Sequence, residues 1–282
     1  MAKVASSGFD AALEYARKHT LHALLVATRK ETLLETYESG YRADLPHPLY
    51  SGTKSFWGTA ALCAVKDGLF ELDEPVTRAI PEFKSDIRKA ITPRMLLSMT
   101  AGYGFGGLGA SVPTYEKALS IPLKNRPGET FTYGGIPLQV FGAFFARILE
   151  PQRETPHAYL KRRVLDPAGV TIDEWRTLGD GNHPLPTGVQ MRASEWLAYG
   201  RYMLQHHQAN ADALHGTPAN ARYGLCWWLA PAGVPEDTFY ASGSAGQGLY
   251  IIPSRDLVVV HFAKSTSYKH DALLKKLLQS TG

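Results

Sequence analysis

The pattern of apolar and polar positions places strand periodicity at the two ends of the chain and helical periodicity between them. Apolar residues at helical spacing predict a first helix over 9–18 and a closing helix over 270–279. Runs rich in β-branched and aromatic residues, bounded by turn residues, predict strands. Five strands are expected in this way, over 23–28, 31–37, 224–230, 249–253 and 257–263.

The middle of the chain has mainly helical patterns. Thr92 and Pro93 are typical of the cap and the first position of a helix. The helices expected here cover 51–65, 92–97, 138–149 and 193–207. Because strands at both ends must share a sheet to bury their apolar faces, we expect an α+β fold. Its antiparallel sheet would be built from N- and C-terminal strands, flanked by helices, and joined to a mainly helical lobe.

We expect this arrangement to form a single domain over residues 1–282. The sheet lobe would comprise about 1–50 and 218–282, and the helical lobe about 51–217. Small-molecule sites commonly lie in the cleft between two such lobes. The sequence therefore predicts a site where the lobes meet.

Composition and charge are those of an ordinary globular protein. Of the 282 residues, 44% are hydrophobic and 20% are charged, and the formal net charge is +4. The basic residues are scattered, and the cluster Lys161-Arg162-Arg163 is typical of a solvated helix face. No nucleic-acid partner is expected. No apolar stretch approaches the roughly 20 residues that cross a bilayer, so we expect no membrane span.

The cysteines, the histidines and the N-terminus suggest no metal and no disulfide. Cys63 and Cys226 lie far apart in apolar surroundings and are predicted to be buried free thiols. His206 and His207 end a predicted helix without a third ligand in view, so no metal site is expected. The N-terminus lacks the apolar core of a signal peptide. This favours a cytoplasmic protein, or a periplasmic or secreted one from which a leader has been removed.

Candidate chemistry begins with Ser51 and Lys54. A serine at the first turn of a helix lies where free N–H groups and the helix dipole favour a developing oxyanion. A lysine three residues later lies on the same helix face, within reach of the serine hydroxyl. Lysine acts as a base only where its surroundings lower its pKa. On its own the Ser-x-x-Lys pattern is weak, because a serine cap followed by a surface lysine has the same spacing.

The surrounding sequence closely resembles the serine β-lactamase and penicillin-binding protein superfamily. Within it the chain is most similar to class C β-lactamases, family VIII carboxylesterases and nylon-oligomer hydrolases. The run Tyr50-Ser51-Gly52-Thr53-Lys54 resembles the start of the family's nucleophile helix. Further segments follow in the family's order over 67–76, 91–102, 127–133, 186–200, 223–228 and 243–253. The resemblance spans nearly the whole chain and implies a β-lactamase/transpeptidase-like fold.

The resemblance also implies roles for individual residues. Ser51 would be the nucleophile that forms an acyl-enzyme, and Lys54 would take its proton. Tyr133 would share the base role and protonate the leaving group. The backbone N–H groups of Ser51 and Ser244 would form the oxyanion hole, which is often worth ~3 kcal/mol. Without the resemblance, Tyr133 would be interpreted as a tyrosine in a turn packed on the core.

Two motifs depart from the family pattern. The asparagine of Tyr-x-Asn is replaced by Gly135, and the cation of Lys-Thr-Gly is replaced by Ala241. Ser242 and Gly243 remain as candidate substrate-binding residues of that motif. In penicillin-binding members the missing cation and its neighbouring hydroxyl help to hold the substrate carboxylate. The departures therefore argue against an efficient β-lactamase or peptidoglycan peptidase.

The sequence thus favours a serine hydrolase that cleaves ester or amide bonds of small substrates, most similar to a carboxylesterase. The alternatives are a β-lactamase or D-Ala-D-Ala carboxypeptidase, and a catalytically inert binding relative. The expected partner is a small-molecule ester, amide or lactam, and the oligomeric state is not predicted. This chemistry needs no cofactor, and none is expected.

A glycine-rich stretch near the middle of the chain matches the letters of a dinucleotide fingerprint. Gly102, Gly104 and Gly107 have that spacing, but they follow a helical pattern and no helix opens after them. We interpret the stretch as a flexible loop beside the cleft. Tyr103 and Phe105 on this loop are predicted to contact substrate.

Overall fold

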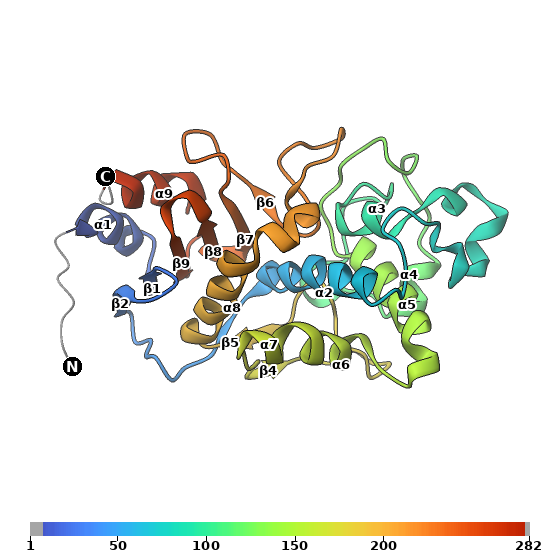
Figure 1. The fold of residues 1–282 in the computed structure, drawn as a ribbon, viewed down its shortest axis with the longest axis horizontal. Helices are drawn as coiled ribbons and strands as arrows, with labels where there is room; N and C mark the ends of the chain where they lie inside the picture. The colour runs from blue at the N-terminus through green and yellow to red at the C-terminus, as the bar shows by residue number, and fades with distance from the viewer. Residues whose placement is uncertain (1–7, 280–282) are drawn as a thin grey trace.

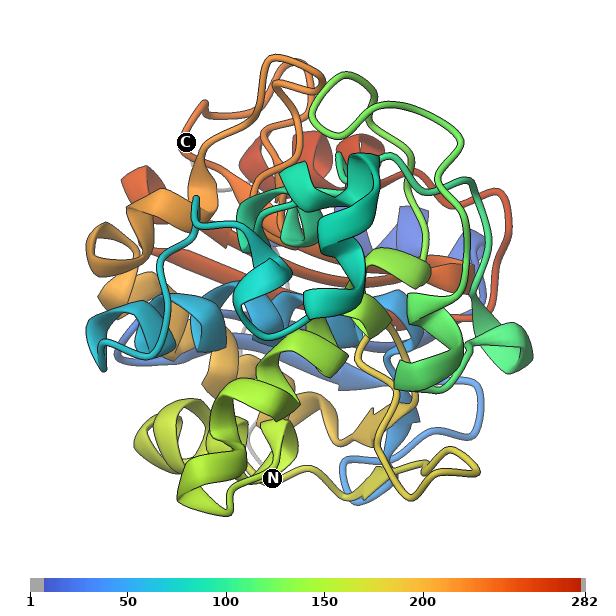
Figure 2. The same ribbon diagram turned by 90° about the vertical axis from the view of Figure 1, so that its right-hand side faces the viewer.

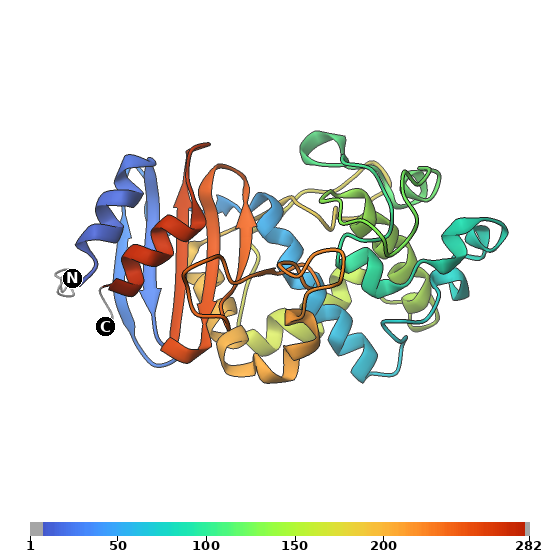
Figure 3. The same ribbon diagram turned by 90° about the horizontal axis from the view of Figure 1, so that it is seen from above.

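A central antiparallel sheet organises the molecule, in a computed structural model that describes residues 8–279. Six strands pair in the order β2-β1-β9-β8-β7-β6, so strands from both ends of the chain lie side by side. Figure 3 shows these strands edge by edge beneath two helices. The α+β fold class expected from the sequence is confirmed. The strands of this sheet are β1 (Leu21–Ala27), β2 (Thr32–Tyr37), β6 (Trp228–Leu229), β7 (Phe239–Gly243), β8 (Gln247–Ile252) and β9 (Leu257–Ala263).

Helices cover both faces of this sheet. Helices α1 (Asp10–Lys18) and α9 (His270–Gln279) lie side by side over one face, where they pack on Leu24 and Val259. Helix α8 (Ala193–His206) covers the other face. The close approach of α8 needs Gly200, where a Cβ atom would lie 2.5 Å from Cγ1 of Val258. Because side chains alternate along the strands, they contribute to two separate apolar layers, one on each face of the sheet.

Helix α2 (Ser55–Lys66) runs through the helical part of the molecule (Figures 1 and 2), and most of its residues are buried. A Cβ atom at Gly58 would collide with the carbonyl oxygen of Leu225, so glycine is required where α2 meets that segment. Around it lie α3 (Pro93–Leu97), α4 (Tyr115–Leu119), α5 (Ile136–Leu149), α6 (Pro156–Leu160) and α7 (Asp166–Ala168). A small second sheet has the order β3-β5-β4, formed by His47–Pro48, Val189–Met191 and Glu174–Trp175.

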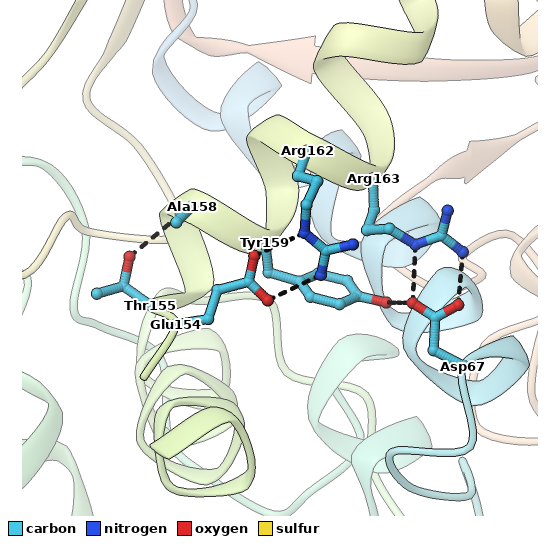
Figure 4. Close-up of polar contacts among 7 residues, drawn as sticks. All are labelled: Asp67, Glu154, Thr155, Ala158, Tyr159, Arg162 and Arg163. Carbon is cyan, nitrogen blue, oxygen red and sulfur yellow. Dashed lines mark hydrogen bonds and ion pairs between the residues drawn. The ribbon is translucent and has the colours of Figure 1, made fainter. Parts of the chain in front are cut away.

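The C-terminal end of α2 is tied to the segment after α6 by a partly buried ion pair (Figure 4). Arg163 donates from Nε and Nη2 to the two carboxylate oxygens of Asp67 at 2.7 and 2.6 Å. The hydroxyl of Tyr159 donates to Asp67 at 2.6 Å. Arg162 pairs with Glu154 alongside. Lys161 and Arg162 are exposed, as expected for a solvated face, whereas Arg163 is partly buried and joins its segment to α2 through Asp67.

Three expectations about local structure needed correction. The helix expected from Ser51 begins as a 3-10 turn, Tyr50–Lys54, and becomes α-helical only at Ser55. Most of the strand expected over 224–230 is irregular. The amides of Leu225 and Cys226 donate to Ala213 and Leu97 instead of to a neighbouring strand. Strand β7 was not predicted from the hydrophobic pattern, because it combines two aromatic residues with alanine, serine and glycine and shows no clear alternation.

Residues 8–279 contain no helix that combines the length and the apolar character needed to cross a membrane. Cys63 and Cys226 are both free thiols, as expected, but only Cys226 is buried, whereas Cys63 is partly exposed.

Candidate active site

The nucleophile candidate lies on a strained turn between β3 and α2. Tyr50, directly before Ser51, has φ +48°, a left-handed conformation that costs energy in a non-glycine residue. The amide of Leu49 donates to the carbonyl oxygen of Val189 at 2.9 Å. The amide of Gly52 donates to the carbonyl oxygen of Leu49, also at 2.9 Å. These bonds hold the turn so that Ser51 stays partly exposed while the next three residues are buried.

Lys54 meets Ser51 as the spacing predicted. Its Nζ donates to the Ser51 Oγ at 2.8 Å and to the carbonyl oxygen of Pro186 at 3.2 Å. Only 1% of the lysine is exposed, and this burial lowers its pKa to about 7. A large fraction of Lys54 is therefore neutral near pH 7, in contact with the hydroxyl whose proton a base would take.

The ring of Tyr133 packs beside the Lys54 amine. Lys54 Nζ lies 4.7 Å from the centroid of its ring. The ring packs against Trp228, with centroids 5.4 Å apart, and edge-on against Tyr223 at 5.9 Å. Burial raises the pKa of Tyr133 to about 12, while its interaction with Ser51 opposes that shift. At neutral pH the phenol thus keeps its proton, and Lys54 is the better proton acceptor of the two.

The end of β7 reaches the nucleophile turn through Gly243. A Cβ atom there would collide with the carbonyl oxygen of Leu49, so the two backbones touch. Ser244 follows as the first residue of the 3-10 turn Ser244–Gly246, and it is exposed. The first N–H groups of a helical turn lack partners within it. The fold thus brings the segments of Ser51 and Ser244 together, and the oxyanion hole stays a prediction.

Ser242 has a partner that sequence reasoning missed. Its Oγ lies 2.8 Å from Nε2 of His270, the first residue of α9. Nδ1 of the same ring lies 2.6 Å from the hydroxyl of Tyr250 on β8. Nothing in the local sequence marks His270, because a single histidine at a helix start is common and its contacts come from two other elements.

The glycine-rich loop packs against the turn that follows Tyr133. The amide of Gly135 donates to the carbonyl oxygen of Gly106 at 2.9 Å, and a Cβ atom at Gly135 would collide with Gly107. The loop thus fills the space that an asparagine side chain would need at position 135. Phe105 is 77% exposed, whereas Tyr103 is 1% exposed and offers no surface to a substrate in this structure.

Between residues 8 and 279, no three or more His, Cys, Asp or Glu side chains gather as a metal site would require. The arrangement at Ser51 consists of an alcohol, a buried amine and a phenol. These groups fit nucleophilic and acid–base chemistry at a carbonyl.

Comparison with known proteins supplies relatives of this architecture. Protein Rv1367c of Mycobacterium tuberculosis strain H37Rv is 28% identical over an alignment of 189 residues, and the match covers 53% of this chain and 46% of that protein. The match therefore spans about half the length of this curated relative.

Solved structures match over more of the chain. A class C β-lactamase from Rhodobacter sphaeroides has a TM-score of 0.74 at 15% identity, covering 98% of both chains. EstCE1, a hydrolase with promiscuous acyltransferase activity, has a TM-score of 0.76 at 17% identity, covering 98% of this chain and 97% of its own. A Bacillus anthracis protein described as a candidate 6-aminohexanoate-dimer hydrolase has a TM-score of 0.77 at 18% identity, covering 95% and 79%.

At these identities the structural matches establish the fold, and the family comes from the sequence. The family model described as Beta-lactamase matches residues 16–281, nearly the full length. The chain belongs to the β-lactamase family.

Proposed function

We propose that the protein is a serine hydrolase that cleaves ester or amide bonds of small substrates through an acyl-enzyme on Ser51. The observation that carries this proposal is the 2.8 Å contact between Lys54 Nζ and Ser51 Oγ, made by an amine whose pKa burial lowers to about 7, so that a substantial fraction is neutral near pH 7. A serine hydroxyl becomes an effective nucleophile when a base in hydrogen-bond contact can take its proton.

The first half of the reaction forms the acyl-enzyme. Ser51 Oγ bonds to the substrate carbonyl carbon while its proton passes to Lys54. The negative charge that develops on the carbonyl oxygen is held by the backbone N–H groups of Ser51 and Ser244. Collapse of this intermediate breaks the bond to the leaving group, which takes a proton from Tyr133. The phenol suits this role because, with a pKa raised to about 12, it still carries its proton at neutral pH.

The second half releases the acid. A water attacks the ester on Ser51 and gives up a proton to the Tyr133 phenolate left by the first half, while Lys54 still carries the proton that Ser51 lost. The bond between the acyl carbon and Ser51 Oγ then breaks, and Ser51 regains its proton. Each turnover consumes one water and regenerates all three side chains.

Two replacements favour esters of small uncharged substrates, a carboxylesterase-type activity, over β-lactams. Position 241 is alanine, so this strand contributes no cation for a substrate carboxylate. Position 135 is glycine, and the loop at Gly106 and Gly107 fills the space of an amide side chain there. The remaining polar candidate of the strand motif is Ser242, with Gly243 beside it.

Paired hydrolysis of p-nitrophenyl acetate and nitrocefin tests this function. Wild type, Ser51→Ala and the matched control Ser120→Ala, an exposed serine at the end of α4, would be compared. We expect ester turnover that is lost in Ser51→Ala, retained in Ser120→Ala, and accompanied by little nitrocefin turnover.

Other outcomes lead to the alternative functions. Strong nitrocefin turnover would make the protein a β-lactamase, and stable acylation by penicillin would favour a D-Ala-D-Ala carboxypeptidase. Unchanged ester turnover in Ser51→Ala would show that Ser51 is not the nucleophile. Absence of turnover together with no labelling of Ser51 by a fluorophosphonate probe would favour an inert binding relative.

A further inference from the structure

Strand β7, which touches the nucleophile turn, contacts His270 of α9 on its other face. Along β7, Phe239 and Ala241 are buried in the core shared with α2 and α8. Tyr240 and Ser242 alternate with them and face the side covered by α9, where the ring of Tyr240 lies 5.2 Å from that of His270. Gly243 follows and touches the backbone before Ser51. Ser242 is thus one residue from the point where the strand and the nucleophile turn meet.

Four side chains form a continuous hydrogen-bonded row from the partly exposed Tyr268, through the buried Tyr250 and through His270, to Ser242. The hydroxyls of Tyr268 and Tyr250 lie 2.7 Å apart. The Tyr250 hydroxyl lies 2.6 Å from Nδ1 of His270, and Nε2 of His270 lies 2.8 Å from Ser242 Oγ. Tyr250 is fully buried, so its contacts are screened from water.

The proton count along this row selects one tautomer of the imidazole. If Tyr268 donates to Tyr250 and Tyr250 donates to Nδ1, then the ring proton is on Nε2 and points at Ser242. With the opposite tautomer, Nδ1–H would donate to Tyr250 and Tyr250 to Tyr268. The Tyr268 proton would then have no acceptor among the contacts that residues 8–279 give it and would have to donate to solvent. The Nε2–H tautomer gives each tyrosine proton an acceptor.

The surroundings keep this imidazole neutral. Burial lowers the pKa of His270 to about 4, against the opposing effect of Asp271. Tyr240 of β7, Tyr250 of β8 and Tyr268 of the preceding loop face the ring, and burial raises the pKa of each phenol. Around neutral pH the row therefore contains neutral groups, and hydrogen-bond direction rather than charge decides what Ser242 presents.

We propose that His270 is a positioning residue for substrate binding: its Nε2–H donates to Ser242 Oγ, which leaves the Ser242 hydroxyl proton free to donate to a substrate oxygen beside Ser51. This role rests on the proposed hydrolase function. It offers the substrate a neutral donor where position 241 has no cation. It fits a carbonyl, ether or ester oxygen, and it gives a carboxylate no charge partner.

The space next to this row is open to a ligand. An open hollow of about 620 Å³ lies over the start of α9, lined by Tyr240, Tyr268, Lys269, His270 and Asp271 among others. Because Tyr240 and His270 belong to both the hollow and the row, a substrate that extends past β7 would place its distal part against aromatic side chains. The rings would contact an apolar part of such a substrate, and Lys269 and Asp271 in the same lining would contact polar atoms of it.

Nuclear magnetic resonance tests the tautomer without any substrate. Long-range nitrogen–proton correlation of the histidine rings in ¹⁵N-labelled protein distinguishes Nε2–H from Nδ1–H, and His270→Gln identifies the signals of His270. We expect the neutral Nε2–H form at pH 7. An Nδ1–H form or a doubly protonated ring would overturn the proposal.

Kinetics with p-nitrophenyl butyrate test the role. Removing one neutral hydrogen bond should raise KM about three- to tenfold in Ser242→Ala and in His270→Ala, with kcat changed less. His270→Gln keeps an N–H donor near the position of Nε2 and should stay within about twofold of wild type. The double variant Ser242→Ala/His270→Ala should be no worse than Ser242→Ala alone, because both act through one hydroxyl. His215→Gln, an exposed histidine outside the row, is the matched control.

The remaining outcomes are decisive. Unchanged KM in Ser242→Ala, or additive losses in the double variant, would mean that His270 only stabilises α9, provided that the fluorophosphonate probe still labels Ser51. Absence of both labelling and ester turnover in the wild type would overturn the proposed function and this role with it.

Discussion

In the proposed mechanism Lys54 must lose a proton before it can accept one from Ser51, so the surroundings of its amine would set the working pH. In water a lysine is almost fully protonated at pH 7. Here the amine is 1% exposed and its hydrogen-bond partners are neutral oxygens, so burial dominates and lowers its pKa to about 7. Tyr133 is shifted in the opposite sense, to about 12. Two titratable groups whose pKa values are moved apart in this way can divide the roles of base and acid.

A pH profile follows from this pair of shifts. Below pH 7 Lys54 is an ammonium group and cannot take the proton, so kcat/KM for p-nitrophenyl acetate should fall about tenfold per pH unit. Above pH 7 it should reach a plateau, which persists while Tyr133 remains protonated. The profile would be measured after subtraction of Ser51→Ala as the blank. A midpoint near the ordinary lysine value of 10.5 would contradict Lys54 as the neutral base.

Between elements, the contact of β7 with the nucleophile turn decides whether the candidate residues meet. Gly243 touches Leu49, and the turn is held from the other side by the bond of Leu49 to Val189. Away from this contact, the ion pair of Asp67 and Arg163 ties α2 to the π-helical turn Lys161–Leu165. The first contact brings the segments of the candidate residues together, whereas the second joins α2 to the segment after α6.

Replacing Gly243 by alanine should separate β7 from the nucleophile turn. The new Cβ atom would collide with the carbonyl oxygen of Leu49, so one of the two backbones must shift. Shifts of this kind cost catalysis steeply, and we expect an ester kcat/KM about 100-fold lower. Gly179→Ala is the matched control, because a Cβ atom at that position would have no other atom within 4 Å and its φ is ordinary. Near-normal activity of Gly243→Ala would show that this contact does not position the site.

Removing the charge of Asp67 should affect stability rather than activity. Asp67→Asn loses the bidentate ion pair with Arg163. The side chains of Arg163 and Asp67 are 28% and 29% exposed, so solvent screening limits the loss in free energy of unfolding to about 1–2 kcal/mol. The midpoint of urea unfolding would show it. Asp44→Asn, which breaks a more exposed pair with Arg42, should change the midpoint much less. Equal effects of the two variants would argue against a special role for the Asp67 contact.

In the whole molecule, one sheet joins the two ends of the chain and separates two apolar layers. Leu274 of α9 belongs to the layer beneath α1 and α9. The tryptophans all pack in or against the other layer, on the side of α2 and α8, and are Trp57, Trp175, Trp196, Trp227 and Trp228. Since every strand of the large sheet contributes to the separation of these layers, we expect them to unfold together.

Leu274→Ala tests this cooperativity. The cavity should cost about 2–4 kcal/mol. If the molecule unfolds as one unit, tryptophan fluorescence and far-ultraviolet circular dichroism should shift to the same lower urea midpoint, although the substitution is remote from every tryptophan. Leu278→Ala, on a partly buried position of the same helix, should shift both less. A fluorescence midpoint that stays at the wild-type value would indicate independent unfolding of the two layers.

Local patterns in the sequence were sufficient for most elements. Helices α1, α5 and α8 and strands β1, β2, β8 and β9 follow their apolar periodicity, and Thr92 caps α3 through the amide of Met95. The spacing of Ser51 and Lys54 also determined their contact, because three residues make about one turn in either a 3-10 or an α-helix. The family model matches residues 16–281, so the family assignment covers nearly the whole chain.

Tertiary structure decided what local periodicity does not encode. The irregular path at Leu225 and Cys226 depends on hydrogen bonds to Ala213 and Leu97, which are distant in sequence. The burial of Tyr103 and of Lys54 depends on what packs over them, and that burial moves the lysine pKa by desolvation. His270 meets Ser242 only because α9 lies across β7 and β8. The sequence alone thus determined which residues could react, whereas packing determined their protonation and their partners, because both depend on atoms brought together from distant parts of the chain.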